Sequence, residues 1–449
     1  MESEGGRHEN GHRVTGRVQK KTLRRLARKS GFVRRQGKLT AYEFVVLMTV
    51  GQLALKHPSL AAMVQAIEAK ISREALHQRF TVQSVLFLRG CLDHVLRQKL
   101  ASPKPLDAAL LRPFRRILIF DSSSWDIDPK LKAVLPGCGG GASEANCKLQ
   151  AGYEYKRGQL GFFQVSAGTR PDQAYSPALP GLVAKGDLVL EDLGYFKVKT
   201  FRQYHDKGAY FLSRFLVGTT ICQADTGKSL DVGGILHRFN GDFLELNVVL
   251  GTVIKEQTPC RFIALRVCEQ AANKRRRKLL KEAKKKGRTP SQAHLALCDW
   301  TLLITNVPAD LLPATMAYEL YRVRWQIELL FKQLKSVMRI HKSDTGLENR
   351  LRCELYGKLL MAVLIHRVHA FLQGDLWHSQ RREVSFDKLH KRFQERAFLL
   401  LRQCLISIKA ACRFLRAEIP RMLNACFKAH QHSRQTTLQR LDQPLPSNA

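Results

Sequence analysis

The sequence predicts an α/β fold: a mixed sheet, an antiparallel β region inserted into it, and helical regions at both ends of the chain. Two observations predict it. Short apolar runs typical of buried strands alternate with helical patterns through the middle of the chain, and period-two strands then follow one another. The predicted regions are a basic helical region at 1–110, the sheet core at 111–372 with its β insertion at about 217–299, and a helical region with a disordered tail at 373–449.

The chain is strongly basic. Its 449 residues include 74 Lys and Arg against 38 Asp and Glu, a formal charge of +36, while 45% of the residues are hydrophobic. This surplus on a globular chain indicates a polyanionic partner, and nucleic acid comes before anionic membrane because we find no unbroken apolar run of about 18 residues. The N-terminus lacks a signal-peptide apolar segment, and the eleven cysteines lack zinc-finger spacing. We expect a soluble, cytoplasmic protein with free thiols.

The first helical region offers two DNA-binding candidates. Residues 13–35 are basic and helical in pattern, either as a solvated arm or as a helix that contacts phosphates. After an apolar helix expected in the core, residues 59–81 indicate a helix, a turn and a second helix capped by Ser72. That second helix presents Arg73 and Arg79, as a helix-turn-helix would, although many helical pairs look alike.

From Arg115 the order becomes three strands, helix, strand, helix, strand. The predicted elements are a strand at 115–121, a hairpin at 149–168, a short helix at 175–184, a strand at 187–192, a helix at 198–208 and a strand at 209–215. This order fits an RNase H-like core whose first and fourth strands are neighbours. The Gly-rich stretch at 136–143 is a flexible connection and no phosphate loop, because no GKS or GKT follows it.

The β insertion contains a basic run, in which ten of the 15 residues from Lys274 to Arg288 are Lys or Arg. It is either a disordered basic loop, or a helix within a partly disordered loop, or a segment that grips the DNA backbone, which we favour. The first basic residues of this grip are Lys274, Arg275, Arg276 and Arg277.

The run YRVRWQIELLFKQLK places a phenol, two cations and an acid at the spacing Y-x2-R-x3-E-x6-K. The four residues are Tyr321, Arg324, Glu328 and Lys335. Wound as an α-helix, at roughly 100° per residue, their side chains fall within a sector of about 60° on one face. Such a face suits a metal ion held beside a DNA phosphate. The alternative is an amphipathic helix with Arg324 and Glu328 as an ordinary i,i+4 pair.

Three carboxylates complete a candidate metal site. Two predicted strands end in Asp121 and Asp192, and the later helix carries Glu328. Ligands of open α/β sheets bind at the carboxyl ends of the strands, and carboxylates there could hold hard divalent cations. Glu191 would point to the opposite face from Asp192, so we prefer Asp192 as the ligand. We find no P-loop, Ser-His-Asp or HExxH motif.

On these residues the chain resembles bacterial insertion-sequence transposases of the DDE superfamily, and more narrowly the group with the YREK signature (insertion-sequence family four). The resemblance covers about residues 40–370 and is carried by ILIFDSSSWD, LVLEDLGYF and YRVRWQIELLFKQLK. It implies that Asp121, Asp192 and Glu328 are catalytic and bind two Mg²⁺ ions, with Mn²⁺ as a substitute. It also implies that Tyr321, Arg324 and Lys335 contact DNA phosphates near the scissile bond.

The resemblance further implies cut-and-paste transposition through hairpin ends. A homodimer would hold the terminal inverted repeats of the element and the target DNA in a synaptic complex, in the bacterial cytoplasm at the nucleoid. In this group a tryptophan of the insertion traps a flipped base. Trp300 suits that role, but it precedes a buried strand and is equally a core residue. Trp325 is expected to pack or to stack on DNA.

Other functions stay open at this point. An RNase H-like nuclease would cut DNA without joining it, and a transposase-derived protein would bind DNA without catalysis. A basic RNA-binding protein is a third alternative, but the chain lacks the interleaved aromatic residues of a sheet platform.

Overall fold

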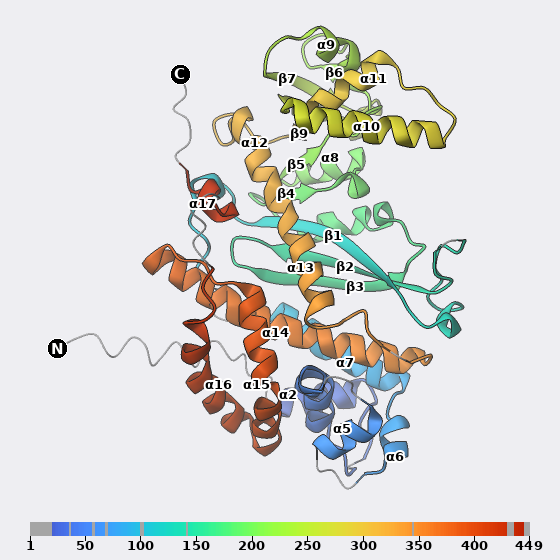
Figure 1. Ribbon diagram of the computed structural model, residues 1–449, viewed down its shortest axis with the longest axis vertical. Coiled ribbons are helices and arrows are strands. Elements are labelled where there is room, and N and C mark those ends of the chain that lie inside the picture. The colour runs from blue at the N-terminus through green and yellow to red at the C-terminus, as the bar shows by residue number, and fades with distance from the viewer. Residues whose placement is uncertain are drawn as a thin grey trace, which may run out of the picture. The chain divides into compact units, whose positions relative to one another are not determined.

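The computed structural model describes residues 20–35, 37–55, 59–67, 71–98, 103–140, 142–343, 345–428 and 435–443. The chain divides into two compact units, each made of three segments. The first unit consists of Met1–Leu106, Ser122–Arg170 and Glu328–His432. The second unit consists of Asp107–Asp121, Pro171–Ile327 and Ser433–Ala449. The division falls within strand β1 (Ile117–Asp126) and within helix α13 (Trp325–Ser336), so each has residues in both units. Both elements are labelled in Figure 1.

The first unit is mainly helical and is organised around α14 (Glu348–Gln380), most of whose residues are buried. A Cβ atom at Gly357 would lie 2.0 Å from the carbonyl oxygen of Met48, so glycine allows the π-helical turn η1 (Leu47–Gly51) to pack against α14. By length and composition α14 could cross a membrane, but 72% of its most apolar window is buried inside the protein. Burial of this kind is usual for the core helix of a folded domain.

The other helices of the first unit confirm the predicted helical ends of the chain. Their bounds are α2 (Lys20–Lys29), α3 (Ala41–Val46), α4 (Gln52–Ala54), α5 (Leu60–Ala66), α6 (Arg73–His77), α7 (Val82–Arg97), α15 (Phe386–Ile406) and α16 (Ile408–Leu423). The Ser72 side chain caps α6 as predicted, accepting a hydrogen bond from the Ala75 N–H at 3.0 Å. Residues 13–19 of the predicted basic helix lie outside the described residues.

The strands of the first unit follow the order β3-β2-β1. As predicted, β2 (Asn146–Glu154) and β3 (Gln159–Ala167) form an antiparallel hairpin. The turn between them contains Gly158 in the left-handed region, with φ of 61°. Beside this hairpin, β1 (Ile117–Asp126) continues five residues further than the predicted end at Asp121. The reason is that its two halves have different neighbours, β4 (Leu188–Glu191) for the first half and β2 for the second.

In the second unit the strand order is β1-β4-β5-β9-β8-β7-β6. The bounds of the strands are β4 (Leu188–Glu191), β5 (Tyr210–Arg214), β6 (Ile221–Gln223), β7 (Phe243–Leu250), β8 (Thr258–Arg266) and β9 (Trp300–Thr305). β1, β4 and β5 are parallel, and every later pairing is antiparallel. The structure thus confirms an RNase H-like mixed sheet, with the first and fourth strands adjacent and an antiparallel β insertion.

Helices flank the sheet of the second unit (Figure 1). Their bounds are α8 (Val198–Asp206), α9 (Val232–Arg238), α10 (Glu269–Lys285), α11 (Gln292–Ala296), α12 (Ala314–Tyr321) and α17 (Thr437–Leu441). Two of them bear on the predictions. The basic run forms the regular 17-residue helix α10, so a helix was the correct alternative to a disordered loop. The prediction of a disordered tail is wrong for α17, because Leu438 and Leu441 are buried and Arg440 pairs with Glu319 of α12 at 3.4 Å.

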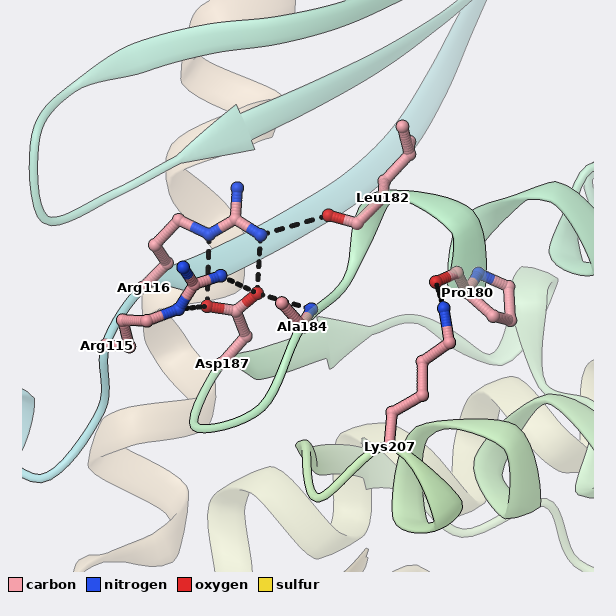
Figure 2. Close-up of polar contacts among 7 residues, drawn as sticks. All are labelled: Arg115, Arg116, Pro180, Leu182, Ala184, Asp187 and Lys207. Carbon is pink, nitrogen blue, oxygen red and sulfur yellow. Dashed lines mark hydrogen bonds and ion pairs between the residues drawn. The ribbon is translucent and has the colours of Figure 1, made fainter.

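One buried carboxylate fixes the start of both central strands (Figure 2). Asp187 directly precedes β4, and its fully buried side chain accepts paired hydrogen bonds from Arg115 and Arg116, which directly precede β1. The Ala184 N–H donates a further bond at 2.9 Å. Burial alone would raise the pKa of Asp187, but the hydrogen bonds from the two arginines outweigh it and lower the pKa. The β1–β4 ladder begins at the next residue pair, Ile117 and Leu188.

We predict that Asp187→Asn lowers the free energy of unfolding by roughly 2 to 3 kcal/mol. The loss lies toward the lower end for a broken buried ion pair, because both guanidinium groups are partly exposed. Urea denaturation followed by circular dichroism measures it. The matched control is Asp206→Asn, which removes an exposed i,i+4 pair with Arg202 and should change the free energy by less than about 0.5 kcal/mol. Equal effects of the two substitutions would contradict this role of Asp187.

Candidate active site

The register of the central strands brings Asp121 and Asp192 side by side. The parallel β1–β4 ladder pairs Ile119 with Leu190, and two further residues along each strand lead to Asp121 and Asp192. Asp121 lies within β1, and Asp192 is the first residue after β4. Both side chains are partly exposed. Two carboxylates therefore meet at the carboxyl end of β4, at the edge where ligands bind in open α/β sheets.

Two residues of the YREK run contact these strands within the second unit. The Arg324 Nη1 atom lies 3.4 Å from Asp121 Oδ2, and both side chains are less than a fifth exposed. The Tyr321 hydroxyl donates to the backbone oxygen of Glu191 at 3.3 Å. Burial raises the pKa of Tyr321; the positive charge of Arg324 acts against this rise, and the negative charge of Asp192 acts with it. Asp121, Asp192, Tyr321 and Arg324 thus form one electrostatic cluster.

The YREK run is not the single α-helix that the sequence predicts. Helix α12 ends at Tyr321, the residues Arg322–Arg324 form a 3₁₀ turn, and α13 (Trp325–Ser336) begins after it. The tighter turn buries Val323 and leaves the Trp325 side chain 55% exposed. The sector of about 60° calculated for a continuous helix therefore does not apply to all four residues.

Glu328 and Lys335 lie on the part of α13 that belongs to the first unit. The Lys335 ammonium donates to the backbone oxygen of Ser124 at 2.9 Å and lies 5.9 Å from the ring centroid of Trp125. Burial lowers the pKa of Lys335. Ser124 and Trp125 continue the strand that carries Asp121, so Lys335 contacts the same strand three residues further along.

The donor atoms suit a hard cation, although they are not gathered in the geometry of a bound ion. Among the described residues no group of three His, Cys, Asp or Glu side chains lies close enough together to hold a metal ion. Asp121 and Asp192 nonetheless offer carboxylate oxygens, the donors that Mg²⁺ prefers. The positive charge beside Asp121 in this structure is the guanidinium group of Arg324.

Glu191 and Asp192 are adjacent in sequence but have different surroundings. The Glu191 side chain is fully buried and accepts a hydrogen bond of 2.6 Å from the Tyr204 hydroxyl of α8. Burial raises the pKa of Glu191 to about 8, so this carboxyl group is largely protonated at neutral pH. Asp192 is partly exposed. These surroundings favour Asp192 as the charged ligand, as the alternation along the strand predicts.

Sequence reasoning missed Arg214, the last residue of β5. The β4–β5 ladder pairs Glu191 with Ser213, so the next step places Arg214 beside Asp192. Arg214 is exposed, and its charge acts on Tyr321 and on Arg275. The signal was present in the run AYFLSRF, a predicted strand in which Arg214 is the last residue but one. The preceding predicted strand ends with Asp192, so the two charged residues occupy similar positions at the ends of the two strands.

The two predicted tryptophan contacts have different environments. Trp300 is 3% exposed and lies in the core of the second unit, with the Arg266 guanidinium 4.4 Å from its ring centroid. This burial favours the core interpretation, and contact with a base remains a prediction that requires the side chain to leave the core. Trp325 is 55% exposed, and its stacking on DNA stays a prediction.

The four predicted basic residues of α10 divide into two kinds. Arg275 donates to the Trp300 oxygen at 2.8 Å and to Thr301, and Arg276 pairs with Asp299, so both join α10 to β9 and the turn before it. Lys274 and Arg277 are exposed. In the first unit Arg73 is exposed and Arg79 is partly buried.

Comparison with known proteins identifies the family. A family model described as the transposase DDE domain matches residues 112–364, more than half of the chain. The chain belongs to this family. The transposase for insertion sequence element IS231F of Bacillus thuringiensis subsp. israelensis is 29% identical over 84% of this chain and 83% of its own length. The transposase for element IS1151 of Clostridium perfringens is 28% identical over 76% of each chain.

A solved structure of a piggyBac transposase synaptic complex with hairpin DNA is also similar, over 89% of this chain and 81% of that one. Its sequence identity is 11% and its TM-score is 0.45. The matched family region contains Asp121, Asp192 and the whole YREK run.

We predict that Glu191→Gln changes the pH dependence of stability. The pKa of Glu191 is about 8 in the folded state and about 4.3 in the unfolded state. Between about pH 4.3 and about pH 8, therefore, the folded protein keeps a proton on this carboxyl group that the unfolded chain has released. The parent protein therefore loses stability as pH rises through this window, and the glutamine variant does not.

The difference between the unfolding free energies of variant and parent should grow by roughly 2 to 4 kcal/mol from pH 5 to pH 8. Urea titrations at several pH values measure it. Glu282→Gln, at an exposed position on α10, is the control and should leave the curves parallel. Parallel curves for Glu191→Gln would show that this carboxyl group is ionised in the folded protein.

Proposed function

We propose that this transposase binds the ends of its insertion element and catalyses metal-dependent cleavage and strand transfer of DNA. The observation that carries the proposal is the β1–β4 register, which leads to Asp121 and Asp192 at one sheet edge beside Arg324 and Tyr321. Asp121 and Asp192 would supply two carboxylate ligands. Glu328, one helical turn after Arg324 in the chain, would supply the third.

Divalent ions bound there, Mg²⁺ or Mn²⁺ in its place, would activate a water or hydroxyl nucleophile and stabilise the leaving 3′-oxygen. The protein's own residues would orient the DNA and neutralise its charge. Arg324, released from Asp121, would move to a phosphate oxygen. Lys335 and Arg214 would add positive charge. The buried Tyr321 hydroxyl would hold the end of strand β4 in place through its hydrogen bond to the Glu191 backbone oxygen.

The resemblance to the YREK group implies the finer steps that we include in the proposal. Cleavage at the element end frees a 3′-hydroxyl, which attacks the opposite strand to form a hairpin that water reopens. The 3′-hydroxyl then attacks target DNA. Since both ends must be cut together, a homodimer is expected to hold two DNA ends, with the C-terminal helices α15 and α16 as candidates for the contact between copies.

We expect Asp121→Asn, Asp192→Asn and Glu328→Ala each to reduce cleavage by about a hundredfold or more while the protein stays folded, because each removes a proposed ligand of the ions. The measurement uses a labelled duplex with the element's own terminal repeat, incubated with Mg²⁺ and resolved on a denaturing gel. Asp126→Asn is the matched control and should leave cleavage unchanged. Asp126 lies on the same strand as Asp121, but its side chain accepts a hydrogen bond from Asn146.

Each alternative predicts a different gel. Cuts without end specificity would favour a nuclease that does not join DNA. Tight binding of the element end with no cleavage in any divalent metal would favour a DNA-binding derivative. Hairpin products that depend on all three carboxylates would establish the proposed transposition chemistry.

The division of cations on α10 gives a separate prediction. Lys274→Glu/Arg277→Glu should weaken DNA binding by about tenfold or more at 100 mM salt and leave thermal stability unchanged, since both side chains are exposed. Arg275→Ala/Arg276→Ala should instead lower the melting temperature, because these side chains bind β9 and Asp299. Fluorescence anisotropy and thermal denaturation measure the two effects, and the reverse pattern would contradict the assignment.

A further inference from the structure

The first unit contains a cavity of about 1010 Å³, and among its described lining residues only Lys335 has a role in the function proposed above. It lies among the end of α4, the connection between α13 and α14, and one side of α14, with Arg73 of α6 at its wall. This volume is at the upper end of the range for ligand pockets, roughly 300 to 1,000 Å³. Lys335, the last residue of the YREK run, is part of the lining.

The lining is strongly cationic. Its Lys and Arg residues are Arg73, Lys335, Arg339, Lys342, Arg350 and Lys358. Among the described lining residues Glu354 is the one carboxylate, and it already accepts hydrogen bonds from Ser343 at 2.7 Å and Arg350 at 2.9 Å. Burial lowers the pKa of His341 in the same wall, and the charges of Lys342, Lys335 and Lys358 lower it further. The cavity therefore has a positive potential.

The arrangement is held in place by the protein backbone. The buried Lys358 ammonium donates to the backbone oxygens of Arg339 at 3.1 Å and Lys342 at 2.6 Å, which fixes the turn after α13. Arg339 has a left-handed backbone there, with φ of 49°, which is rare for a residue other than glycine. This turn presents the Lys342 side chain to solvent. In the described part of the chain neither Lys342 nor Arg73 has an ion-pair partner.

We propose that this cavity binds consecutive backbone phosphates of a DNA strand next to the cleavage position, an inference that rests on the proposed function. Phosphate is the anion class that several Lys and Arg side chains recognise together. The described lining contains no Phe, Tyr or Trp on which a free nucleotide could stack its base, so the strand backbone is the better fit. Lys335 would connect the cavity to the scissile phosphate, and Arg73 would connect it to the N-terminal helices.

The test measures DNA affinity against salt concentration, in EDTA, for the full-length protein and Arg73→Ala/Lys342→Ala. Each lost contact to a duplex phosphate reduces the magnitude of the slope of log K against log salt by about 0.9. The slope of the double variant should therefore be smaller in magnitude than that of the parent by up to about 1.8. Arg73→Lys/Lys342→Arg should retain the parent slope. Lys391→Ala/Arg392→Ala is the matched control: it removes two exposed cations of α15 that do not line the cavity.

An unchanged slope in the Arg73→Ala/Lys342→Ala variant would overturn the proposal. A second arm measures thermal stabilisation by pyrophosphate and by ATP. Stabilisation that depends on Arg73 and Lys342, with an unchanged DNA slope, would mean that the cavity takes free phosphate compounds and would also overturn it. DNA binding measured without metal does not depend on cleavage. A parent protein that cuts no element end would refute the proposed function, whereas the salt dependence of DNA binding would still test the proposed phosphate site.

Discussion

The geometry of the candidate active site depends on the ion pairs between Asp187 and the two arginines that precede β1. This contact lies one residue before the first rung of the β1–β4 ladder, so it sets the register in which the strands run toward Asp121 and Asp192. A shift by one residue would turn one aspartate to the other face of the sheet. A buried carboxylate is favourable here because two guanidinium groups and a backbone N–H satisfy it.

The cations of this chain fall into two groups that composition alone does not separate. Some cations hold the fold: Arg275 and Arg276 join α10 to β9, and Lys358 binds the turn after α13. Others, such as Lys274 and Lys342, are exposed. The exposed cations supply the charge that the proposed DNA contacts require, since an arginine already bonded within the fold contributes less to phosphate binding.

Local patterns in the sequence predicted much of the fold, because short apolar runs, caps and acidic residues after strands are determined by neighbouring residues. The strands of the antiparallel insertion and the cap at Ser72 were predicted in this way, and the adjacency of the first and fourth strands was predicted from the order of the elements, which fits an RNase H-like core. Features set by distant partners were missed. β1 extends past Asp121 because β2 lies beside it, α17 folds because α12 offers it a partner, and Arg214 joins the site through the β4–β5 register.

The proposed chemistry requires that Asp121 and Asp192 form one cation site. A double-mutant cycle on Mn²⁺ affinity, measured by electron paramagnetic resonance for the parent, Asp121→Asn, Asp192→Asn and the double variant, tests it most directly. If both carboxylates bind the same ion, the second substitution should reduce the Mn²⁺ affinity less when the first carboxylate is already absent. The coupling free energy between the two substitutions should be about 1 kcal/mol or more. Additive effects, or unchanged affinity in either single variant, would contradict the account.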